Sequence, residues 1–449
     1  MIYDFIELHP KTSVPMCTQI YKELQSAIRN GKLLPHEKMP SIRRAALELG
    51  VSRTTIETAY ARLCSAGYLY SKAQSGYYVE ETIEKAPLSV LVEKENDEEI
   101  LYDFSSGKID EKAADTLRWK KYLRAALQEE KDLLSYGDPQ GEPSLREAIA
   151  SYVFRARGVM TQSKNIVIGA GTQFLLSLFC SLYSKKVTIA MDAPGFKQAE
   201  RIFKDYGFQV ALVQVHESKS LLMQLEACHA TIYLDIPANH PHKTETFMRK
   251  KRQELWKWVH AKDNRYILED DYNGELRYTK RPRPAMQSLA PQHVIYLGSF
   301  SKLLLPSVRI AYMVLPEALL ERYRERKQDY NATAGKMEQL ALAKYIEDGL
   351  LEKHLRRLQK LYAEKSTCLY DILQNYLPLK RISILETSLS IVIHLEGEFA
   401  GKTLENKLKE NGVRVDFIHK NHLRLSFSGM PIENFLPAVL AIQKALESV

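Results

Sequence analysis

Residues 293–302, HVIYLGSFSK, decide the fold of the larger part of the chain. They form an apolar stretch that runs into a short polar turn and ends at a lysine. Long helical stretches separate this segment from four similar ones, IVIGA (166–170), VTIAM (187–191), TIYLDI (231–236) and YILED (266–270). Such alternation of apolar strands and helices predicts an α/β fold with a mainly parallel sheet. The charged helical stretch at 317–376 and the alternating tail from residue 381 predict a smaller α+β C-terminal subdomain.

The turn after this strand carries groups that suit a phosphorylated aldehyde. Ser299, Ser301 and Arg309 could hold a phosphate, and the amine of Lys302 could form an imine with an aldehyde. Pyridoxal phosphate supplies both chemical groups. The sequence therefore predicts this cofactor, with Lys302 as its covalent partner.

The segment Asp270-Asp271-Tyr272 supports the same cofactor. A carboxylate there could pair with a pyridinium nitrogen, and the phenol could donate to the phenolate oxygen of the cofactor. The turn with Lys302 and the segment Asp270-Asp271-Tyr272 each lie at the carboxyl end of a predicted strand. Ligands of open α/β sheets bind at these ends.

Two further segments are weaker signals. Gly171 and Thr172, in GAGTQ (169–173), follow a strand and open a helix, so backbone N–H groups and the hydroxyl could hold phosphate. Phe196, in DAPGF (192–196), could stack on a pyridine ring, although phenylalanine is more often a core residue. A single SxSK motif is usually a surface feature. The ordered set of four motifs is what favours the cofactor site.

Composition limits the class of protein. The 449 residues exceed one ordinary domain of roughly 100–200 residues, and 45% hydrophobic with 26% charged residues is typical of a soluble globular protein. No apolar stretch approaches the roughly 18–20 residues that span a bilayer, and the segment MIYDFIELHP does not resemble a signal peptide. We therefore expect a cytoplasmic protein with no membrane partner. Its five scattered cysteines show no CxxC pair, so we expect reduced thiols and no metal site.

Charge is distributed unevenly along the chain. Residues 11–79 contain ten Lys or Arg and four acids, whereas residues 80–100 contain eight acids and two lysines. Basic segments attract phosphate backbones, although a solvated surface without a partner gives the same count. We place a basic domain at 11–79, an acidic linker at 80–101 and the α/β domain at 102–449.

Elements within 11–79 indicate three helices and a wing. A helix covers 21–29, a second runs from Ser41 to Gly50, a third starts at Ser52, and 68–79 forms a hairpin. In a helix-turn-helix the first residues of the second helix read base edges. The predicted DNA contacts are Ser41, Arg43, Arg44, Ser52, Arg53, Thr54, Thr55 and Gly76. A capped helical bundle without DNA explains the helices alone equally well.

The run from Val14 to Glu80 resembles the winged helix-turn-helix domain of GntR-type bacterial regulators. The matching pieces are GKL (31–33), MPSIR (39–43), LGVSRTT (49–55) and the wing glycine Gly76. Glu37 stands where the family usually has glycine, and Met39 where leucine is usual. This resemblance implies that the domain binds double-stranded promoter DNA.

Residues 102–449 resemble fold type I aminotransferases, and specifically the aminotransferase-like domain of the MocR subgroup of those regulators. The resemblance implies an internal aldimine at Lys302, a ring-nitrogen partner in Asp270 and a phenolic-oxygen contact from Tyr272. It assigns phosphate contacts to Thr172, Ser299, Ser301 and Arg309, and ring stacking to Phe196. It also implies that Arg424 clamps a substrate carboxylate, and that Tyr136 reaches the cofactor phosphate of the other subunit in a homodimer.

One loop departs from the family pattern. The family usually shows a His-Gln pair followed by Pro-Thr-Gly or Pro-Ser-Gly, whereas residues 236–244 here read IPANHPHKT. Asn239 or His240 could still approach the cofactor oxygen, and the sequence does not decide between them. The departure leaves imine formation intact and argues against efficient transamination, which also needs ordered proton transfer and water control.

The sequence thus predicts a transcriptional regulator that binds pyridoxal phosphate and senses an amine, an amino acid or the cofactor itself. We expect no physiological turnover, with at most weak transaminase half-reactions. Two alternatives remain open at this point: a working aminotransferase with a DNA-binding appendage, and an inactive fold that serves only for dimerisation. The sequence does not identify the effector, the operator or the sign of regulation.

Overall fold

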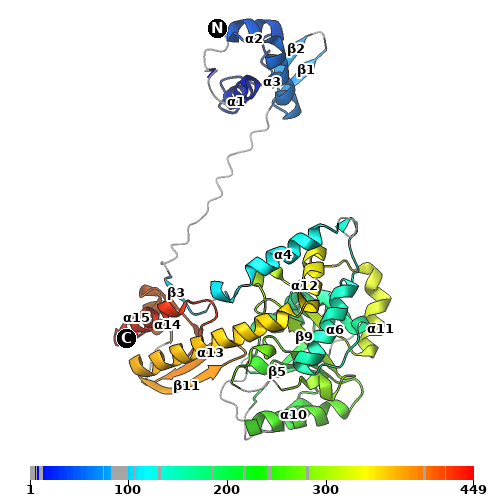
Figure 1. Cartoon of the computed structure of the whole chain (residues 1–449), viewed down its shortest axis with the longest axis vertical. Coiled ribbons are helices and arrows are strands. Elements are labelled where there is room, and N and C mark those ends of the chain that lie inside the picture. The colour runs from blue at the N-terminus through cyan, green and yellow to red at the C-terminus, as the bar shows by residue number, and fades with distance from the viewer. Residues whose placement is uncertain are drawn as a thin grey trace. The chain divides into compact units, whose positions relative to one another are not determined.

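A computed structural model describes most of the chain. The described residues are 6, 8–9, 14–73, 75–81, 100–105, 107–129, 133–183, 187–193, 195–215, 219–239, 245–279, 283–397, 401–419 and 421–448. The chain divides into two compact units, unit 1 (residues 1–96) and unit 2 (97–449), which are drawn in Figure 1 and described separately below. Most of the predicted linker 80–101, namely residues 82–99, lies outside the described residues.

Unit 1 contains three helices and a two-stranded hairpin. Its elements are α1 (Met16–Arg29), α2 (Ile42–Leu49), α3 (Arg53–Ser65), β1 (Leu69–Lys72) and β2 (Gly76–Val79). The strands pair antiparallel, with Leu69 opposite Val79. The first helix starts at Met16 and not at the predicted Tyr21, because Ile20 extends its buried face by one turn toward the N-terminus.

The core of unit 1 fixes the angle between its helices. Ile56, Ala59, Tyr60 and Leu63 are fully buried on one face of α3, as their spacing predicts. The Tyr60 hydroxyl donates to the Pro40 carbonyl (3.1 Å), which ties α3 to the start of α2. Gly50 ends α2 with φ +66°, a left-handed conformation that glycine adopts without strain.

The centre of unit 2 is a seven-stranded sheet. In spatial order its strands are β4 (Ile166–Gly169), β10 (Ala311–Val314), β9 (Val294–Ser299), β8 (Tyr266–Asp270), β7 (Ile232–Asp235), β5 (Thr188–Asp192) and β6 (Gln209–Val213). The pairs from β9 to β6 are parallel, and β10 runs antiparallel to both β9 and β4. The predicted mainly parallel sheet is therefore confirmed, and the carboxyl ends of β5, β7, β8 and β9 share one edge.

Helices cover both faces of this sheet. They are α4 (Thr116–Leu127), α6 (Pro143–Arg157), α7 (Thr172–Ser181), α8 (Lys197–Asp205), α9 (Leu221–Ala227), α10 (Glu245–His260), α11 (Glu317–Arg326) and α12 (Lys336–Glu347). Strand residues alternate between separate cores: Ile168 packs in the cluster with α6 and α12, while Val167 packs in the cluster with α7 and α11. Within the described ranges, no helix has both the length and the apolar character needed to cross a membrane.

The C-terminal part of unit 2 is an α+β layer beside the long helix α13 (Leu350–Tyr376). Its sheet has the order β11 (Leu379–Leu385), β12 (Ser390–Leu395), β15 (His422–Ser426) and β14 (Asp416–His419). Helices α14 (Gly401–Glu410) and α15 (Phe435–Glu447) pack with it, and β13 (Val413–Arg414) pairs with β3 (Tyr102–Asp103). Figure 1 shows α13 running from the large sheet to β11.

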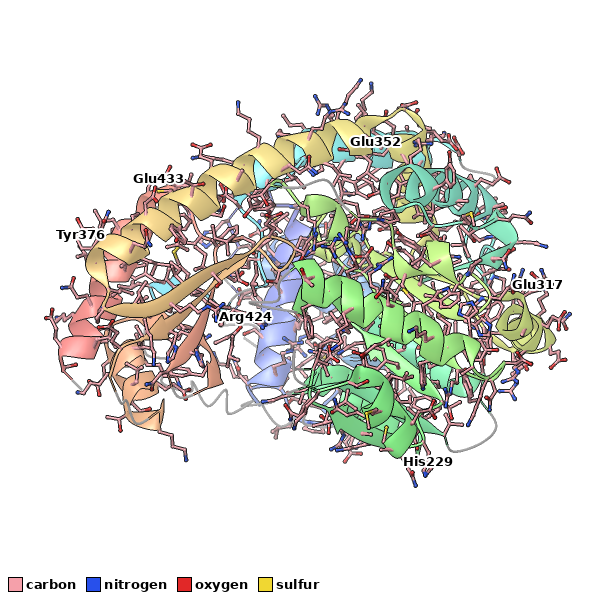
Figure 2. All side chains as sticks on the ribbon, turned by 90° about the horizontal axis from the view of Figure 1, so that it is seen from below. His229, Glu317, Glu352, Tyr376, Arg424 and Glu433 are labelled. Carbon is pink, nitrogen blue, oxygen red and sulfur yellow. The ribbon has the colours of Figure 1, made fainter. Side chains whose placement is uncertain are left out.

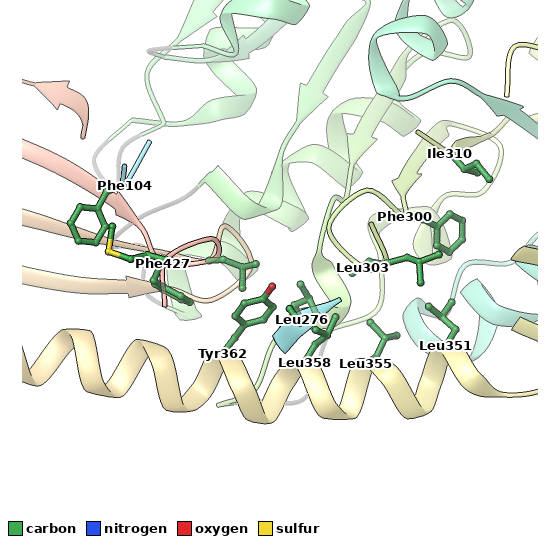
Figure 3. Close-up of a cluster of buried hydrophobic side chains, with 14 of the residues drawn as sticks. Phe104, Leu276, Phe300, Leu303, Ile310, Leu351, Leu355, Leu358, Tyr362 and Phe427 are labelled. Carbon is green, nitrogen blue, oxygen red and sulfur yellow. The ribbon is translucent and has the colours of Figure 1, made fainter. Parts of the chain in front are cut away.

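Helix α13 also anchors the turn that carries Lys302. Leu351, Leu355 and Leu358 of α13 belong to the same buried cluster as Phe300 and Leu303, which flank the lysine (Figure 3). Because Phe300 and Leu303 are almost fully buried, the backbone on both sides of Lys302 is fixed by packing. Its side chain is therefore presented from a rigid turn.

Candidate cofactor site and nucleic-acid interface

A cavity of about 540 Å³ opens at the carboxyl edge of the large sheet. The predicted site residues that line it are Thr172, Phe196, Asp270, Tyr272, Ser299, Ser301, Lys302, Arg309 and Arg424. Gln173, Leu176, Gln198, Ile236 and Asn273, which sequence reasoning did not select, complete the lining. Segments more than 250 residues apart in the sequence therefore meet in one place, which is the location that an open α/β sheet favours for a ligand.

Lys302 has the properties of an amine that reacts with an aldehyde. Its side-chain nitrogen donates a long hydrogen bond of 3.5 Å to the Ser428 hydroxyl oxygen. Burial lowers the pKa of Lys302, because the charged form loses hydration. A larger fraction of this lysine is consequently neutral and nucleophilic at neutral pH.

Asp270 is the carboxyl group that faces the cavity. It ends β8 and is 5% exposed, and its carboxyl group accepts no hydrogen bond from any residue that the structure describes. Burial, together with the neighbouring Asp271, raises the pKa of Asp270 to about 7. A pyridinium N–H would supply the missing hydrogen bond and an opposite charge, so this residue fits the ring nitrogen of pyridoxal phosphate.

The carboxylates on either side of Asp270 face away from the cavity and are satisfied by the protein. Glu269 accepts from the backbone N–H groups of Met286 (2.7 Å) and Gln287 (3.0 Å). Asp271 pairs with Arg157 at 2.6 Å and accepts from the Tyr296 hydroxyl at 2.9 Å. The alternation of side chains along an extended segment thus leaves only the middle carboxylate for a ligand.

The groups predicted to bind phosphate surround the start of α7. Gly171 has φ +91°, and a Cβ placed there would lie 2.5 Å from a guanidinium nitrogen of Arg309. Glycine is therefore required both for the turn and for the close approach of Arg309. Thr172 begins the helix, where unpaired N–H groups favour an anion, and Ser299 and Ser301 line the same cavity.

Arg424 enters the cavity from the C-terminal sheet. It lies on β15 opposite Val392 and Asp416, and Figure 2 shows it on the side of that sheet that faces the rest of unit 2. Its Nε atom is buried and has no hydrogen-bond partner among the described residues. A buried donor of this kind fits a ligand carboxylate, which guanidinium can bind through two parallel hydrogen bonds.

Three predicted site residues are not among the residues that line the cavity. Gly171 immediately precedes the lining residue Thr172. Tyr136 is 95% exposed and does not line the cavity. Asn239 belongs to the short helix η3 (Pro237–Asn239), but its side chain is outside what the structure describes, as is the whole of His240. Their predicted roles remain predictions. In the ranges that are described, no group of three or more His, Cys, Asp or Glu side chains could hold a metal ion.

Sequence reasoning missed a buried lysine beneath the site. Lys251 of α10 forms ion pairs with Asp192 (3.1 Å) and Asp235 (2.6 Å), the last residues of β5 and β7. Those strands lead directly to Phe196 and Ile236, which line the cavity. Lys251 therefore bridges the two strand ends that these residues follow. The signal was weak in the sequence, since Lys251 sits within the charged run RKKR (249–252).

The predicted DNA-reading residues of unit 1 lie at the starts of α2 and α3. The Ser52 hydroxyl accepts from the Thr55 N–H (3.1 Å) and so caps α3, while Arg53 and Thr54 are exposed. The Ser41 hydroxyl caps α2 in the same way, through the Arg44 N–H.

The remaining predicted DNA contacts differ in whether other residues of unit 1 engage them. Arg44 pairs with Glu48 at 2.9 Å, whereas Arg43 is exposed. Gly76 begins β2 with φ +115°, a conformation that a residue with a side chain rarely adopts. Lys38, which sequence reasoning did not select, lies beside this glycine and over the Tyr78 ring.

Comparisons with protein families divide the chain in the same way. Residues 17–79 match the family model described as bacterial regulatory proteins, gntR family, and residues 99–442 match the model for aminotransferase class I and II. Known structures are similar to unit 2 in fold. Kynurenine aminotransferase of Pyrococcus horikoshii has a TM-score of 0.68 at 22% identity, covering 78% of this chain and 91% of that one.

Several curated relatives combine both parts. The HTH-type transcriptional regulator YdeL of Bacillus subtilis is 32% identical, covering 91% of this chain and 90% of its own length. MocR of Rhizobium meliloti, a probable rhizopine catabolism regulatory protein, is 29% identical over 81% of this chain and 78% of its own. PdxR of Corynebacterium glutamicum, a pyridoxine biosynthesis transcriptional regulator, is 28% identical over 81% of this chain and 80% of its own.

The fold and the site therefore define a fold type I aminotransferase-like domain joined to a winged helix-turn-helix. The chain belongs to the MocR subgroup of GntR-type transcriptional regulators. This membership confirms the predicted regulator class and pyridoxal phosphate as the cofactor of the aminotransferase-like fold.

Replacing Lys251 tests its positioning role. Lys251→Met removes the buried cation that Asp192 and Asp235 share, so we expect the free energy of unfolding to fall by about 3–5 kcal/mol. The neighbouring exposed Lys250→Met should change it by less than about 0.5 kcal/mol. Chemical denaturation of unit 2, followed by tyrosine and tryptophan fluorescence, measures both. Equal stability of the two variants would contradict this role.

Replacing Ser52 tests its role as the N-terminal cap of α3. Ser52→Ala removes the cap of α3 and should destabilise that helix by about 1 kcal/mol, whereas Ser52→Asp keeps a capping oxygen. Hydrogen exchange of α3 amides should therefore speed up in the alanine variant only. Thr58→Ala, which removes a hydroxyl from mid-helix, is the control. Unchanged exchange in Ser52→Ala would show that the cap contributes nothing.

Proposed function

We propose that the cavity binds pyridoxal phosphate covalently through Lys302, and that it senses a primary amine, an amino acid or the cofactor itself. The sensed ligand then changes the affinity of unit 1 for promoter DNA. Nine predicted side chains that line one cavity carry this proposal. The most specific observation among them is the buried carboxyl of Asp270, which has no hydrogen-bond partner among the described residues and a raised pKa. When bound, the cofactor supplies an aldehyde that condenses with amines and a ring that withdraws electrons.

The chain's own residues perform five tasks in this proposal. Asp270 holds the ring nitrogen, and its ionised form becomes favourable once a positive charge lies beside it. Thr172, Ser299, Ser301 and Arg309 hold the phosphate. Phe196 packs against the ring, and Tyr272 donates to the phenolic oxygen, since burial raises its pKa to about 12 and keeps it protonated. Lys302 supplies the amine, and burial lowers its pKa, which increases the neutral fraction.

Arg424 supports an effector that carries a carboxylate. Its buried Nε lacks a partner among the described residues, and its guanidinium lines the same cavity as Lys302. An amine without a carboxylate would leave that donor unsatisfied, which costs about 1–3 kcal/mol. Selection of amino acids over simple amines follows from this arrangement.

A second copy of the chain would complete the site. Tyr136 is 95% exposed and lies outside the cavity of its own subunit, so its ring is free to reach the phosphate held by a partner. Exposed Leu117 (82%) and Leu134 (87%) accompany it on α4 and the following segment. Exposed large apolar side chains of this kind favour an interface. We therefore propose a homodimer.

Regulation requires the effector to discriminate between two arrangements of the protein. A ligand with equal affinity for both arrangements shifts nothing.

The Lys302→Ala variant tests the covalent site. Wild-type protein saturated with pyridoxal phosphate should be yellow, and borohydride followed by peptide mapping should mark Lys302. The alanine variant should lose the colour and the mark, and Lys402→Ala, an exposed lysine of α14, should keep both. Labelling at another lysine would overturn the assignment. Sustained conversion of an amino acid over many turnovers would favour an aminotransferase instead.

The Arg53→Ala variant tests the DNA interface independently. Loss of one exposed cation at the start of α3 should abolish operator-specific retardation of DNA taken from upstream of the gene, while cofactor absorbance stays unchanged. Arg62→Ala is the control, because Arg62 lies on the same helix near its other end and donates to Thr18. Specific binding that survives Arg53→Ala would refute this interface.

A further inference from the structure

A second cavity lies on the outside of unit 2, along helix α10. It has a volume of about 610 Å³ and shares no lining residue with the cofactor cavity. One wall is a single face of α10, formed by Arg249, Arg252, Gln253, Trp256 and Lys257. These positions follow the i, i+3, i+4 spacing that aligns side chains on a helix. Arg283 and Leu289 form the opposite wall.

The groove carries a concentrated positive charge. Residues 249–262 contain six Lys or Arg and one acid, Glu254. That acid is engaged elsewhere, since its carboxylate accepts from the Leu221 N–H at 2.7 Å. In the ranges that the structure describes, neither Arg249 nor Lys257 forms an ion pair. The charges of these two residues are therefore available to an anion.

Trp256 adds an aromatic surface to these cations. Its ring packs on His260 with centroids 4.4 Å apart, yet the residue remains 44% exposed and lines the groove. Leu289, 51% exposed, contributes apolar surface from the opposite wall. Cations that suit phosphate, next to an indole that suits a flat ring, match the two halves of a nucleotide.

The wall opposite α10 is fixed before any ligand arrives. Arg157 donates to the Arg283 carbonyl at 2.7 Å, and the Ala285 N–H donates to the Arg157 carbonyl at 2.8 Å. The N–H groups of Met286 and Gln287 are held by Glu269. A preorganised wall lowers the conformational entropy lost on binding.

The same contacts reach the cofactor site. Arg157 also pairs with Asp271 at 2.6 Å, and Glu269 and Asp271 are the immediate neighbours of Asp270. A nucleotide that contacts Arg283 therefore acts on the end of β8 through the hydrogen bonds of Arg157, and from that strand end Asp270 faces the cofactor cavity.

We propose that this groove binds a nucleoside phosphate and is coupled to the cofactor site through the end of β8. The phosphate lies among Arg249, Arg252 and Lys257, and the base lies against Trp256. A free nucleotide fits better than duplex DNA, because the bases of a duplex are stacked and their flat faces cannot reach the indole. A volume of about 610 Å³ is also within the range of small-ligand sites.

Calorimetric titration of the full-length, cofactor-loaded protein with adenosine 5′-monophosphate tests the site. We expect saturable binding of one nucleotide per chain. The double variant Arg249→Gln/Lys257→Gln should weaken binding about tenfold or more, because charge-assisted contacts are lost. Trp256→Leu should weaken it severalfold. Lys250→Gln is the matched control, an exposed cation of α10 that does not line the groove, and should bind within about twofold of wild type.

Several results would overturn the assignment. One is a titration that shows no saturable binding heat at nucleotide concentrations up to the millimolar range. Another is a loss of affinity in Lys250→Gln that equals the loss in the double variant. Pyrophosphate binding as tightly as the nucleotide would exclude a ring platform. In a further outcome, duplex DNA that lacks the operator displaces the nucleotide from the wild-type protein and fails to bind the double variant. That pair of results would assign the groove to the DNA backbone.

The coupling has its own test. Saturating nucleotide should change the apparent affinity for pyridoxal phosphate at least about fivefold, and the cofactor should change nucleotide affinity by the same factor. Identical cofactor affinities with and without nucleotide would refute the coupling. Titration of cofactor-free protein with nucleotide measures binding to the groove alone. Its result therefore does not depend on whether Lys302 is the lysine that binds the cofactor covalently.

Discussion

Three consecutive buried carboxyl groups at the end of β8 impose the constraint on which the rest of the site depends. Glu269, Asp270 and Asp271 cannot all remain charged and unpaired in a poorly hydrated interior. The extended backbone sends the first and third to one side, where backbone N–H groups and Arg157 satisfy them. Asp270 is left facing the cavity with a pKa raised to about 7. A cationic partner is what this geometry requires.

The site around this carboxyl group is assembled from segments that are distant in the sequence. Lys302 is fixed by a turn whose flanking side chains pack on α13, and Arg424 arrives from the C-terminal sheet. Lys251 holds the ends of β5 and β7 together beneath the cavity. Because each group is mounted on a packed element, a ligand finds its partners already in position, which lowers the entropic cost of binding.

Much of this arrangement could be predicted from the sequence. Polar residues that directly follow apolar strands, such as Asp270 and Ser299, are brought to one edge by a parallel sheet, so local pattern and topology agree. Lys251 could not be found in this way, since its partners lie 59 and 16 residues away and its neighbours are ordinary surface cations. The groove along α10 was missed for a related reason. A run of basic residues does not reveal which of them share a helix face with Trp256 until the opposite wall is known.

The ring nitrogen of the bound cofactor offers the most direct measurement. Pyridoxal phosphate labelled with ¹⁵N at that position, bound to the wild-type protein, should give a chemical shift typical of a protonated pyridinium across neutral pH. In Asp270→Asn the shift should move to that of a neutral pyridine. A neutral ring nitrogen in the wild-type protein, or the same shift in both proteins, would contradict the account of how this carboxyl group organises the site.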